Sequence, residues 1–397
     1  MSLEFPARRF DTSELVRVSL DGGRIARVAA LEPAAVASLG ERANSLPWVG
    51  PGFVDLQVNG WGGQEFSSTE LTPERVAKVT AEHFAFGVTG YCPTLTTQSY
   101  DCLAHGLAAI HKACETSAVV GRYVSGIHLE GPFFSTEDGP RGAHPKEHCR
   151  RPDWDAFQRL QQAAGGRIKI LTMSVEFDES ADFIAKATAG GVCVAIGHTG
   201  ADGAHIRAAV DAGARMSTHL GNGAHRMLRR HPNYLWDQLA EDRLTASLIV
   251  DGHHLPPEVV KSMVRAKTPE RIVLVSDVSG LAGLPVGKYT TSGCELEILP
   301  DGRLVIAGQD QLLAGASLPI GFGVANVMRF AGVDLTTACS MASTWPARII
   351  AARCGGLRPG DHADLALFHW KHDADRLEIV ATISSGEVMY GAPPKFA

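Results

Sequence analysis

Short runs of β-branched and aliphatic residues alternate with amphipathic stretches from Phe53 to Asp277. Apolar runs without alternation are typical of strands buried on both faces, as in parallel sheets. Eight such strands with intervening helices in roughly 230 residues predict a TIM-type (β/α)8 barrel, the α/β fold class. The expected strands are Phe53–Val58, Val88–Pro93, Val124–Glu130, Ile168–Val175, Val192–Gly197, Arg215–Leu220, Thr245–Val250 and Ile272–Ser276. The expected helices include Pro73–Phe86, Tyr100–Glu115, Ser180–Ala189, Gly203–Ala212 and Pro256–Ala266.

An open, doubly wound sheet is the alternative arrangement of these elements. That fold commonly carries GxGxxG directly after its first strand. The segment after Val58 reads NGWGG instead. The sequence therefore favours the barrel.

The two ends of the chain show short alternating runs of polar and apolar residues, which are typical of antiparallel strands. Residues 1–50 contain LVRVSL and GRIARVAAL around a DGG turn, and residues 355–397 contain DLALFHW, LEIVATISSG and EVMYG. We expect both ends to form one small β-sandwich domain beside a barrel of residues 51–354. We also expect helices at Leu318–Phe330 and Leu335–Ala352, and a hairpin around Asp301-Gly302.

Composition narrows the classes of function. The chain has 397 residues, is 45% hydrophobic and carries a formal net charge of -6. It has no run rich in lysine and arginine, so we expect no nucleic-acid partner. The segment MSLEFPARRF lacks the apolar stretch of a signal peptide, and no run approaches the ~20 apolar residues of a membrane helix. We expect no membrane partner and a cytoplasmic location.

The cysteines agree with that location. None of them has CxxC spacing, and several lie in apolar runs. We expect free thiols of a reducing compartment. The cysteines are Cys92, Cys102, Cys114, Cys149, Cys193, Cys294, Cys339 and Cys354.

Four polar residues stand where predicted strands open into loops: Glu130 in IHLEGPFF, His198 in AIGHTGA, His219 in STHLGNG and Asp277 in VLVSDVSG. In a barrel, such positions meet at the active rim. A carboxylate and two imidazoles can supply the three protein ligands of an open catalytic metal site, and Asp277 then remains as a base. Alternatively, the histidines are hydrogen-bonded core residues and the carboxylates are helix caps or members of ion pairs. Charged groups are rare in strands, so their recurrence at one end favours the metal site.

The order of short motifs along the chain resembles that of a known protein family. PGFVDLQVNGWGG, HLEGPFF, GAHP, GHTGA, THLGNG, DGHH, LVSD and LAGAS follow one another along the chain. In this order they resemble the amidohydrolase superfamily and, more narrowly, the N-acetylglucosamine-6-phosphate deacetylase family. The resemblance spans nearly the whole chain, including the split β-domain. It implies a metal-dependent hydrolase that converts N-acetylglucosamine 6-phosphate into glucosamine 6-phosphate and acetate.

The resemblance also implies a set of metal ligands. Many amidohydrolases carry HxH at the end of the first strand, where this chain has Gln57 and Asn59. A neutral amide is a poorer ligand than imidazole for a borderline divalent ion. The chain therefore resembles the deacetylases that use one metal, held here by Glu130, His198 and His219. We expect one divalent ion per chain, with Zn²⁺ as the first choice and Fe²⁺, Mn²⁺ or Co²⁺ as alternatives.

Catalytic roles follow from the same resemblance. Asp277 accepts the proton of the attacking water and returns it to the leaving amine, which departs poorly as its anion. His144, in the GAHP loop, assists the metal in stabilising the oxyanion.

Substrate-binding residues are implied as well. Asn222 and Gly223 lie in the loop after His219, and His254 lies in DGHH, with His253 as its competitor. The family's pattern also places a phosphate-binding arginine at one further position of this chain.

That position is Arg230, eleven residues after His219. A guanidinium suits phosphate because its forked donors match two oxygens. The resemblance implies a homodimer in which Arg230 reaches the neighbouring subunit's pocket. Arg226 and Arg229 lie nearby, and HRMLRRH is alternatively a solvated basic patch.

Two loops depart from the family. It usually shows HLFNAM or HLYNAM where this chain has HLGNGA, and REPG where this chain has RRHPN. We therefore expect a pocket of different shape beside Asn222. An N-acetylated amino acid or a different N-acetylhexosamine phosphate remains an alternative substrate. A cyclic-amide hydrolase usually carries HxH, and a non-catalytic binding protein has no need of four aligned polar strand ends.

Overall fold

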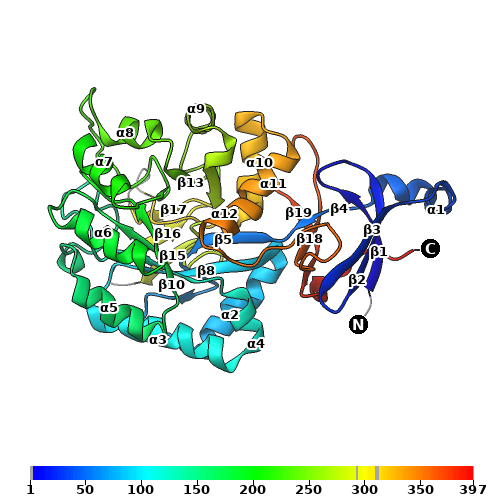
Figure 1. Ribbon diagram of the computed structural model, residues 1–397, viewed down its shortest axis with the longest axis horizontal. Coiled ribbons are helices and arrows are strands. Elements are labelled where there is room, and N and C mark those ends of the chain that lie inside the picture. Colours follow the sequence, from blue (N-terminus) through cyan, green and yellow to red (C-terminus); the bar gives the residue numbers. More distant parts are fainter. Residues whose placement is uncertain (1–2, 292–293, 309–312, 397) are drawn as a thin grey trace.

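The computed structural model describes residues 3–291, 294–308 and 313–396. In this part of the chain, eight parallel strands form a ring at the centre of the larger lobe (Figure 1). Each strand pairs with the next along the chain, and the ring closes where Asp277 N donates to Gln57 O at 2.9 Å and Asn59 N donates to Val278 O at 2.8 Å. The strands are β5 (Phe53–Val58), β8 (Val88–Thr96), β9 (Ile127–Glu130), β10 (Ile168–Met173), β11 (Cys193–Ile196), β12 (Met216–Ser217), β13 (Thr245–Ile249) and β14 (Ile272–Val275).

Helices cover the outside of the ring (Figure 1). Several begin at a side-chain cap; Asp202, for example, accepts hydrogen bonds from the amides of Ala204 and His205 at the start of α7. The helices are α2 (Pro73–His83), α3 (Tyr100–Thr116), α4 (Ala118–Tyr123), α5 (Trp154–Ala163), α6 (Ser180–Ala189), α7 (Gly203–Asp211), α8 (Tyr234–Ala240), α9 (Pro257–Lys267), α10 (Ile320–Ala331), α11 (Leu335–Met341) and α12 (Thr344–Ile349). Short 3-10 turns occupy Gly40–Ser45, Phe84–Phe86, Lys146–His148 and Pro269–Arg271.

The predicted barrel is confirmed. The strands β10 to β14 end one to three residues earlier than predicted, whereas β8 extends beyond its predicted end to Thr96. The expected strand Arg215–Leu220 is reduced to Met216–Ser217. His219 has φ 31°, which is incompatible with extended backbone and stops the strand pairing. The same conformation recurs at His198 (φ 51°) after β11 and at Asp277 (φ 54°) after β14.

Apolar side chains fill the barrel. Val54, Leu56, Ile170, Met216 and Val273 belong to one buried cluster inside the ring. Ala347 and Ile350, from α12 and the residue after it, belong to the same cluster, so this helix closes the amino end of the barrel. The opposite, carboxyl end remains as the place for a site.

The predicted helix Leu335–Ala352 is wrong, because the structure has two helices there. Ser343 has φ -135° and ψ -82°, and its hydroxyl donates to Cys339 O at 2.6 Å. Pro346 has no amide hydrogen to donate back to Ala342, so one helix cannot continue through this segment. The helix predicted at Leu318–Phe330 is confirmed as α10.

Both ends of the chain form the smaller lobe, where Figure 1 shows the two termini. In the described residues its sheet has the order β20-β19-β18-β4-β1-β2-β3 and encloses a separate core that includes Phe5, Val18 and Leu367. The predicted combination of a barrel with a β-domain from both ends is confirmed. The elements are β1 (Leu3–Arg9), β2 (Leu15–Asp21), β3 (Arg24–Ala30), α1 (Pro33–Leu39), β4 (Trp48–Pro51), β18 (Leu365–His369), β19 (Glu378–Ser384) and β20 (Glu387–Gly391).

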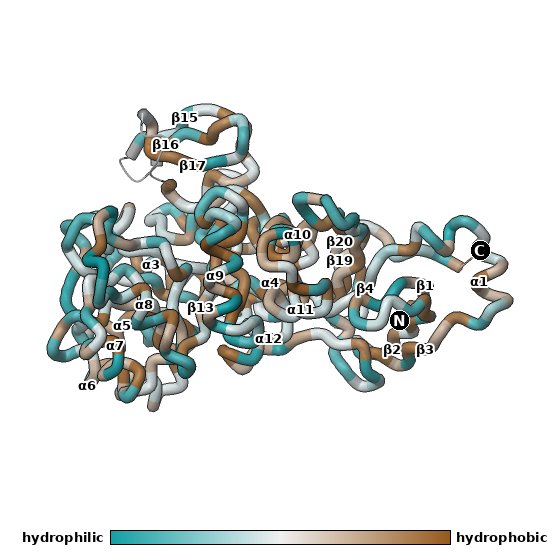
Figure 2. The backbone as a smooth tube through the Cα atoms, turned by 90° about the horizontal axis from the view of Figure 1, so that it is seen from above, coloured by the Kyte–Doolittle hydropathy of each residue, from teal (hydrophilic) through white to brown (hydrophobic). Residues whose placement is uncertain are grey.

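A third small sheet stands out from the barrel in Figure 2. It consists of β15 (Gly287–Thr291), β16 (Cys294–Ile298) and β17 (Leu304–Ile306). The predicted hairpin around Asp301-Gly302 is confirmed, since β16 and β17 pair antiparallel on either side of it. A further pair, β6 (Gly60–Trp61) and β7 (Gln64–Glu65), follows β5.

The structure also bears on the cysteines and on membrane-spanning helices. The seven cysteines whose side chains are described are free, as predicted, and the side chain of Cys294 lies outside that description. Among the described residues, no helix is both long enough and apolar enough to cross a membrane.

Candidate metal and catalytic site

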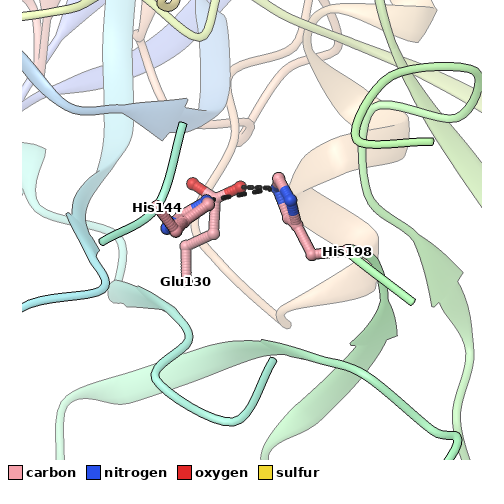
Figure 3. Close-up of side chains that lie close together, drawn as sticks. All are labelled: Glu130, His144 and His198. Atoms are coloured by element: carbon pink, nitrogen blue, oxygen red, sulfur yellow. Dashed lines mark hydrogen bonds and ion pairs between the residues drawn. The ribbon is translucent and has the colours of Figure 1, made fainter. Parts of the chain in front are cut away.

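Four buried side chains converge at the carboxyl end of the barrel. Glu130 Oε1 lies 3.0 Å from His219 Nε2 and 3.3 Å from His198 Nε2. The two Nε2 atoms of His198 and His219 are 3.1 Å apart, and His144 Nε2 lies 3.3 Å from His198 Nε2. Figure 3 shows Glu130, His144 and His198 pointing toward one another. The three residues predicted as metal ligands are therefore brought together, and His144 joins them.

Backbone geometry holds these side chains in place. Glu130 is the last residue of β9, whereas His198 and His219 follow β11 and β12 with positive φ. Left-handed backbone costs a non-glycine residue of order 1–3 kcal/mol and recurs at functional sites. The fold accepts this cost at both histidines.

The partner of His198 fixes its tautomer. Its Nδ1 lies 2.9 Å from the carbonyl oxygen of Pro140, which can only accept a hydrogen bond. Nδ1 therefore carries the hydrogen, and Nε2 presents a lone pair to the cluster. Burial lowers the pKa of His198, which keeps this imidazole neutral. A neutral imidazole is the form that ligates a metal.

His144 has the opposite tautomer. The amide of Thr97 donates to His144 Nδ1 at 3.4 Å, so Nδ1 is the acceptor and Nε2 carries the hydrogen. Burial holds the pKa of His144 well below its usual range, and the ring is neutral. His144 thus presents an N–H donor to the cluster.

The donor set fits a cation. A carboxylate oxygen and imidazole nitrogens at 3.0 to 3.3 Å are electron-rich atoms that need a shared proton or cation between them. Nitrogen and carboxylate ligands in this combination are typical of zinc and similar divalent ions. Glu130, His144 and His198 offer ligand atoms within 4.8 Å of one another, and this group could bind a metal.

Asp277 follows β14, which lies between β13 and β5 in the ring. Its Oδ1 accepts a hydrogen bond from Asn59 Nδ2 at 2.8 Å. Burial, followed by the charge of Glu130, raises the pKa of Asp277 to about 6. A carboxyl group with such a pKa can both accept and return a proton near neutral pH.

His254 is fixed by a neighbouring carboxylate. Its Nδ1 lies 2.7 Å from Asp251 Oδ2, and the amides of His253 and His254 donate to Asp251 Oδ1 at 2.8 and 2.9 Å. Although burial opposes ionisation, the hydrogen bonds from His254 hold the pKa of Asp251 at about 2. His254, rather than His253, is thus the oriented imidazole.

The other predicted binding residues lie in the loop after β12. Gly223 has φ 56°, and a Cβ there would come within 2.8 Å of His198 Nδ1, so the loop packs tightly on that ring. The side chain of Asn222 donates to His219 O at 3.2 Å. Arg230 is exposed. The structure therefore brings Asn222 and Gly223 beside the histidines but leaves Arg230 on the surface of this chain.

A second set of bonds holds this loop. His225 Nε2 lies 3.1 Å from Glu137 Oε2, and the amide of His225 donates to the hydroxyl of Tyr234 at 2.7 Å. Glu137 belongs to the loop after β9, so the loops that follow Glu130 and His219 are tied together.

A separate cavity lies away from these groups. It has a volume of about 410 Å³ and is lined by residues such as Cys193, Arg215 and Thr245, near the starts of β11, β12 and β13. The groups capable of chemistry lie at the carboxyl ends of the strands, so this cavity is not the candidate site.

Sequence reasoning missed several partners in the site. The sequence suggested that Gln57 and Asn59 are poor ligands and that they hydrogen-bond the loop NGWGG, whereas in the structure their amides donate to Glu130 and Asp277. Asp251 follows an apolar strand just as Glu130 does, so the same signal could have found it. No sequence signal marks Thr97 or the carbonyl of Pro140, because both contacts use the backbone.

Three relatives resemble the chain over most of its length. The N-acetylglucosamine-6-phosphate deacetylase of Homo sapiens is 35% identical over 356 residues, which cover 86% of this chain and 83% of that protein. The enzyme of the same name from Bacillus subtilis (strain 168) is 30% identical over 382 residues, covering 94% and 92%. An N-acetylgalactosamine-6-phosphate deacetylase of Escherichia coli O157:H7 is 31% identical over 340 residues, covering 85% and 87%. No family model matches the chain.

Solved structures agree with these relatives. The crystal structure of N-acetyl-D-glucosamine-6-phosphate deacetylase from Mycobacterium smegmatis is 29% identical, with a TM-score of 0.82 and coverage of 97% of this chain and 99% of that one. The N-acetylglucosamine-6-phosphate deacetylase of Thermotoga maritima is 25% identical, with a TM-score of 0.83 and coverage of 99% and 100%.

Proposed function

The chain belongs to the N-acetylglucosamine-6-phosphate deacetylase family of the amidohydrolase superfamily, and from this premise we propose that it hydrolyses the acetamide of N-acetylglucosamine 6-phosphate. The products are glucosamine 6-phosphate and acetate. The observation that carries the proposal is the convergence of Glu130, His198 and His219 at the barrel mouth, with Asp277 at the carboxyl end of β14.

We assign the metal to Glu130, His198 and His219, one divalent ion per chain. His198 supports the assignment because its Nε2 carries a lone pair, whereas His144 presents a hydrogen and is the poorer ligand. Zn²⁺ fits this donor set best, and Fe²⁺, Mn²⁺ and Co²⁺ are the alternatives. When bound, such an ion supplies Lewis acidity that polarises a carbonyl and promotes the ionisation of water.

The remaining groups act on protons and charge. Asp277 accepts the proton of the attacking water and later gives it to the leaving nitrogen, because an amine leaves poorly as its anion. His144 donates through its Nε2–H to the oxygen of the acetamide carbonyl, where negative charge develops in the tetrahedral transition state.

The sugar phosphate binds on the side of His254. Asn222 and Gly223 contact substrate oxygens from the loop after β12, and His254 adds a donor or acceptor oriented by Asp251. Arg230 is exposed in one chain, which suits a homodimer in which it reaches the neighbouring subunit's pocket. A cytoplasmic location fits a substrate of intermediary metabolism.

N-acetylgalactosamine 6-phosphate is a second candidate substrate. Relatives that carry this activity in their names are 31% and 30% identical to the chain. The two sugars differ only in the orientation of one hydroxyl, and the loop HLGNGA departs from the usual family pattern where the sugar would lie.

An acetate-release assay tests the proposal. The panel contains both N-acetylhexosamines, each with and without the 6-phosphate, and N-acetylated amino acids. We expect the highest kcat/KM on N-acetylglucosamine 6-phosphate. Highest activity on an acylated amino acid, or no acetate from any sugar, would refute the assignment.

A further inference from the structure

Two amide side chains at the end of β5 bracket the site. Gln57 is the penultimate residue of β5, and Asn59 directly follows its last residue, Val58. Gln57 Nε2 donates to Glu130 Oε2 at 3.1 Å, and Asn59 Nδ2 donates to Asp277 Oδ1 at 2.8 Å. One strand thus supplies a hydrogen bond to the carboxylate of the metal site and another to the proposed base.

The orientation of each amide follows from its partner. A carboxylate oxygen only accepts, so an amide oxygen at 2.8 Å from Asp277 would face it in repulsion. The NH₂ groups therefore face the carboxylates, and the carbonyl oxygens Gln57 Oε1 and Asn59 Oδ1 point elsewhere. Both oxygens are buried without a hydrogen-bond partner among the described residues. An unpaired buried acceptor is unfavourable, so amides kept here indicate that their donors are needed.

The backbone makes the bracket rigid. Asp277 N donates to Gln57 O at 2.9 Å, and Asn59 N donates to Val278 O at 2.8 Å. These bonds close the barrel and fix the two strand ends relative to each other. Because Asn59 binds Oδ1 of Asp277, Oδ2 is the oxygen that remains for the proton.

Several charged or titratable groups interact electrostatically with Asp277. They are Glu130 from β9, His219 after β12, His254 after β13 and Asp55 from β5. The carboxylates disfavour ionised Asp277, and Asn59 opposes them with a neutral donor.

We propose that Gln57 and Asn59 are positioning residues with separate tasks: Gln57 orients Glu130 for the metal, and Asn59 orients Asp277 and stabilises its ionised form. The inference rests on the proposed function for the role of Asp277. Gln57 and Asn59 thus have a role of their own at the positions where many amidohydrolases carry metal-ligating histidines.

The test uses two near-isosteric variants of the full-length protein, Asn59→Leu and Gln57→Met, which serve as controls for each other. The first readout is the rate at which bound zinc is lost to a chelator, which requires no activity. The second is the kcat–pH profile at saturating zinc with the best acetylated sugar of the panel.

Gln57→Met should weaken zinc retention by about 10- to 100-fold, the usual effect of losing a hydrogen bond to a ligand, and leave the acid limb of the profile in place. Asn59→Leu should retain zinc like the parent, lower kcat by about 10-fold or more and move the acid limb upward by about one pH unit. The limb moves upward because loss of the donor disfavours ionised Asp277.

The inference is overturned if the Asn59→Leu limb stays at the parent position, or if both variants lose zinc equally. Circular dichroism checks that each variant folds, and Asn59→Ala and Gln57→Leu replace any variant that does not. A parent that releases no acetate refutes the proposed function instead, while the chelator assay still tests Gln57.

Discussion

The two halves of the candidate site are built differently. The metal corner (Glu130, His198 and His219) is buried, and its side chains come from strand ends. Glu130 Oε1 and the Nε2 atoms of the two histidines lie 3.0 to 3.3 Å from one another. The distal loop (residues 221–233) is partly exposed, and its arginine at 230 projects from the surface. The barrel thus brings the metal corner together within one chain, whereas we propose that substrate recognition depends on the distal loop and on a second chain.

The metal corner and the distal loop also differ in which residues have left-handed backbone. His198 and His219 accept positive φ at the metal corner, with Asp277 beside them. In the distal loop, positive φ falls at Gly221 and Gly223, where it costs little. Left-handed backbone thus falls on functional side chains in the metal corner and on glycines in the distal loop, where close packing also leaves no room for a Cβ at position 223.

The largest effect should come from breaking the metal corner. In His219→Ala we expect bound zinc to fall well below about one ion per chain and turnover to fall by more than about 10⁴-fold, because Lewis acidity and water activation are lost together. Elemental analysis and acetate release measure both. His205→Ala is the matched control, since His205 is exposed on α7 and pairs with Asp202. Undiminished zinc in His219→Ala, or two tightly held ions in the parent, would contradict the ligand set.

The second prediction separates metal binding from proton transfer at the same corner. Asp277→Asn should retain zinc and lose about 10²–10⁴-fold in kcat, the usual scale of general acid–base catalysis. Single-turnover acetate release with a metal-loaded variant gives the value. Near-parental turnover would remove Asp277 from the mechanism.

The contrast between the metal corner and the distal loop also explains which site residues the sequence could predict. Glu130, His198, His219 and Asp277 were found because each follows an apolar strand, and a closed barrel brings successive strand ends together. The early end of β12 was missed because it depends on local backbone angles that residue type does not determine. The break at Ser343 was missed although Pro346 marks it in the sequence.

The distal half was less predictable. Asn222, Gly223 and Arg230 were identified through the family resemblance, because a loop position carries no periodic signal. Their proximity to the site depends on contacts between loops, such as Glu137 with His225, which join residues 88 positions apart. The exposure of Arg230 reflects a single chain, and sequence pattern says nothing about a second one.

The third prediction concerns that exposed arginine. Arg230→Ala should lower kcat/KM for the 6-phosphorylated sugar by about 10- to 150-fold, the worth of one charge-assisted hydrogen bond, and barely change it for the unphosphorylated sugar. Arg229→Ala is the control, because Arg229 is also exposed. Equal losses on both sugars would mean that Arg230 is structural.

Mixed dimers test whether Arg230 acts in its own chain or across the interface. When Arg230→Ala chains are mixed with Asp277→Asn chains, a hybrid dimer has one pocket with an intact base and an intact arginine only if the arginine acts across the interface. Recovered activity on mixing would support the shared site. No recovery, with hybrid dimers demonstrated, would place Arg230 in its own chain's pocket or outside the site.

The smallest effect should come from Asp251, which accepts hydrogen bonds from the ring and the amide of His254. Its pKa is held at about 2 in the folded protein, against 3.8 ordinarily. A depressed carboxyl pKa stabilises the fold above the ordinary value and loses that contribution as pH falls through the folded value. Asp251→Asn should therefore lower the unfolding free energy by up to about 2 kcal/mol at neutral pH, with the gap closing between about pH 4 and 2.

Urea unfolding followed across pH measures that gap. Asp202→Asn is the control: its pair with His205 is exposed and screened, and asparagine caps α7 as well as aspartate does. A gap that stays constant from neutral pH down to about pH 2 would mean that Asp251 contributes shape rather than charge. His254 would then be held by packing rather than by the charge of Asp251.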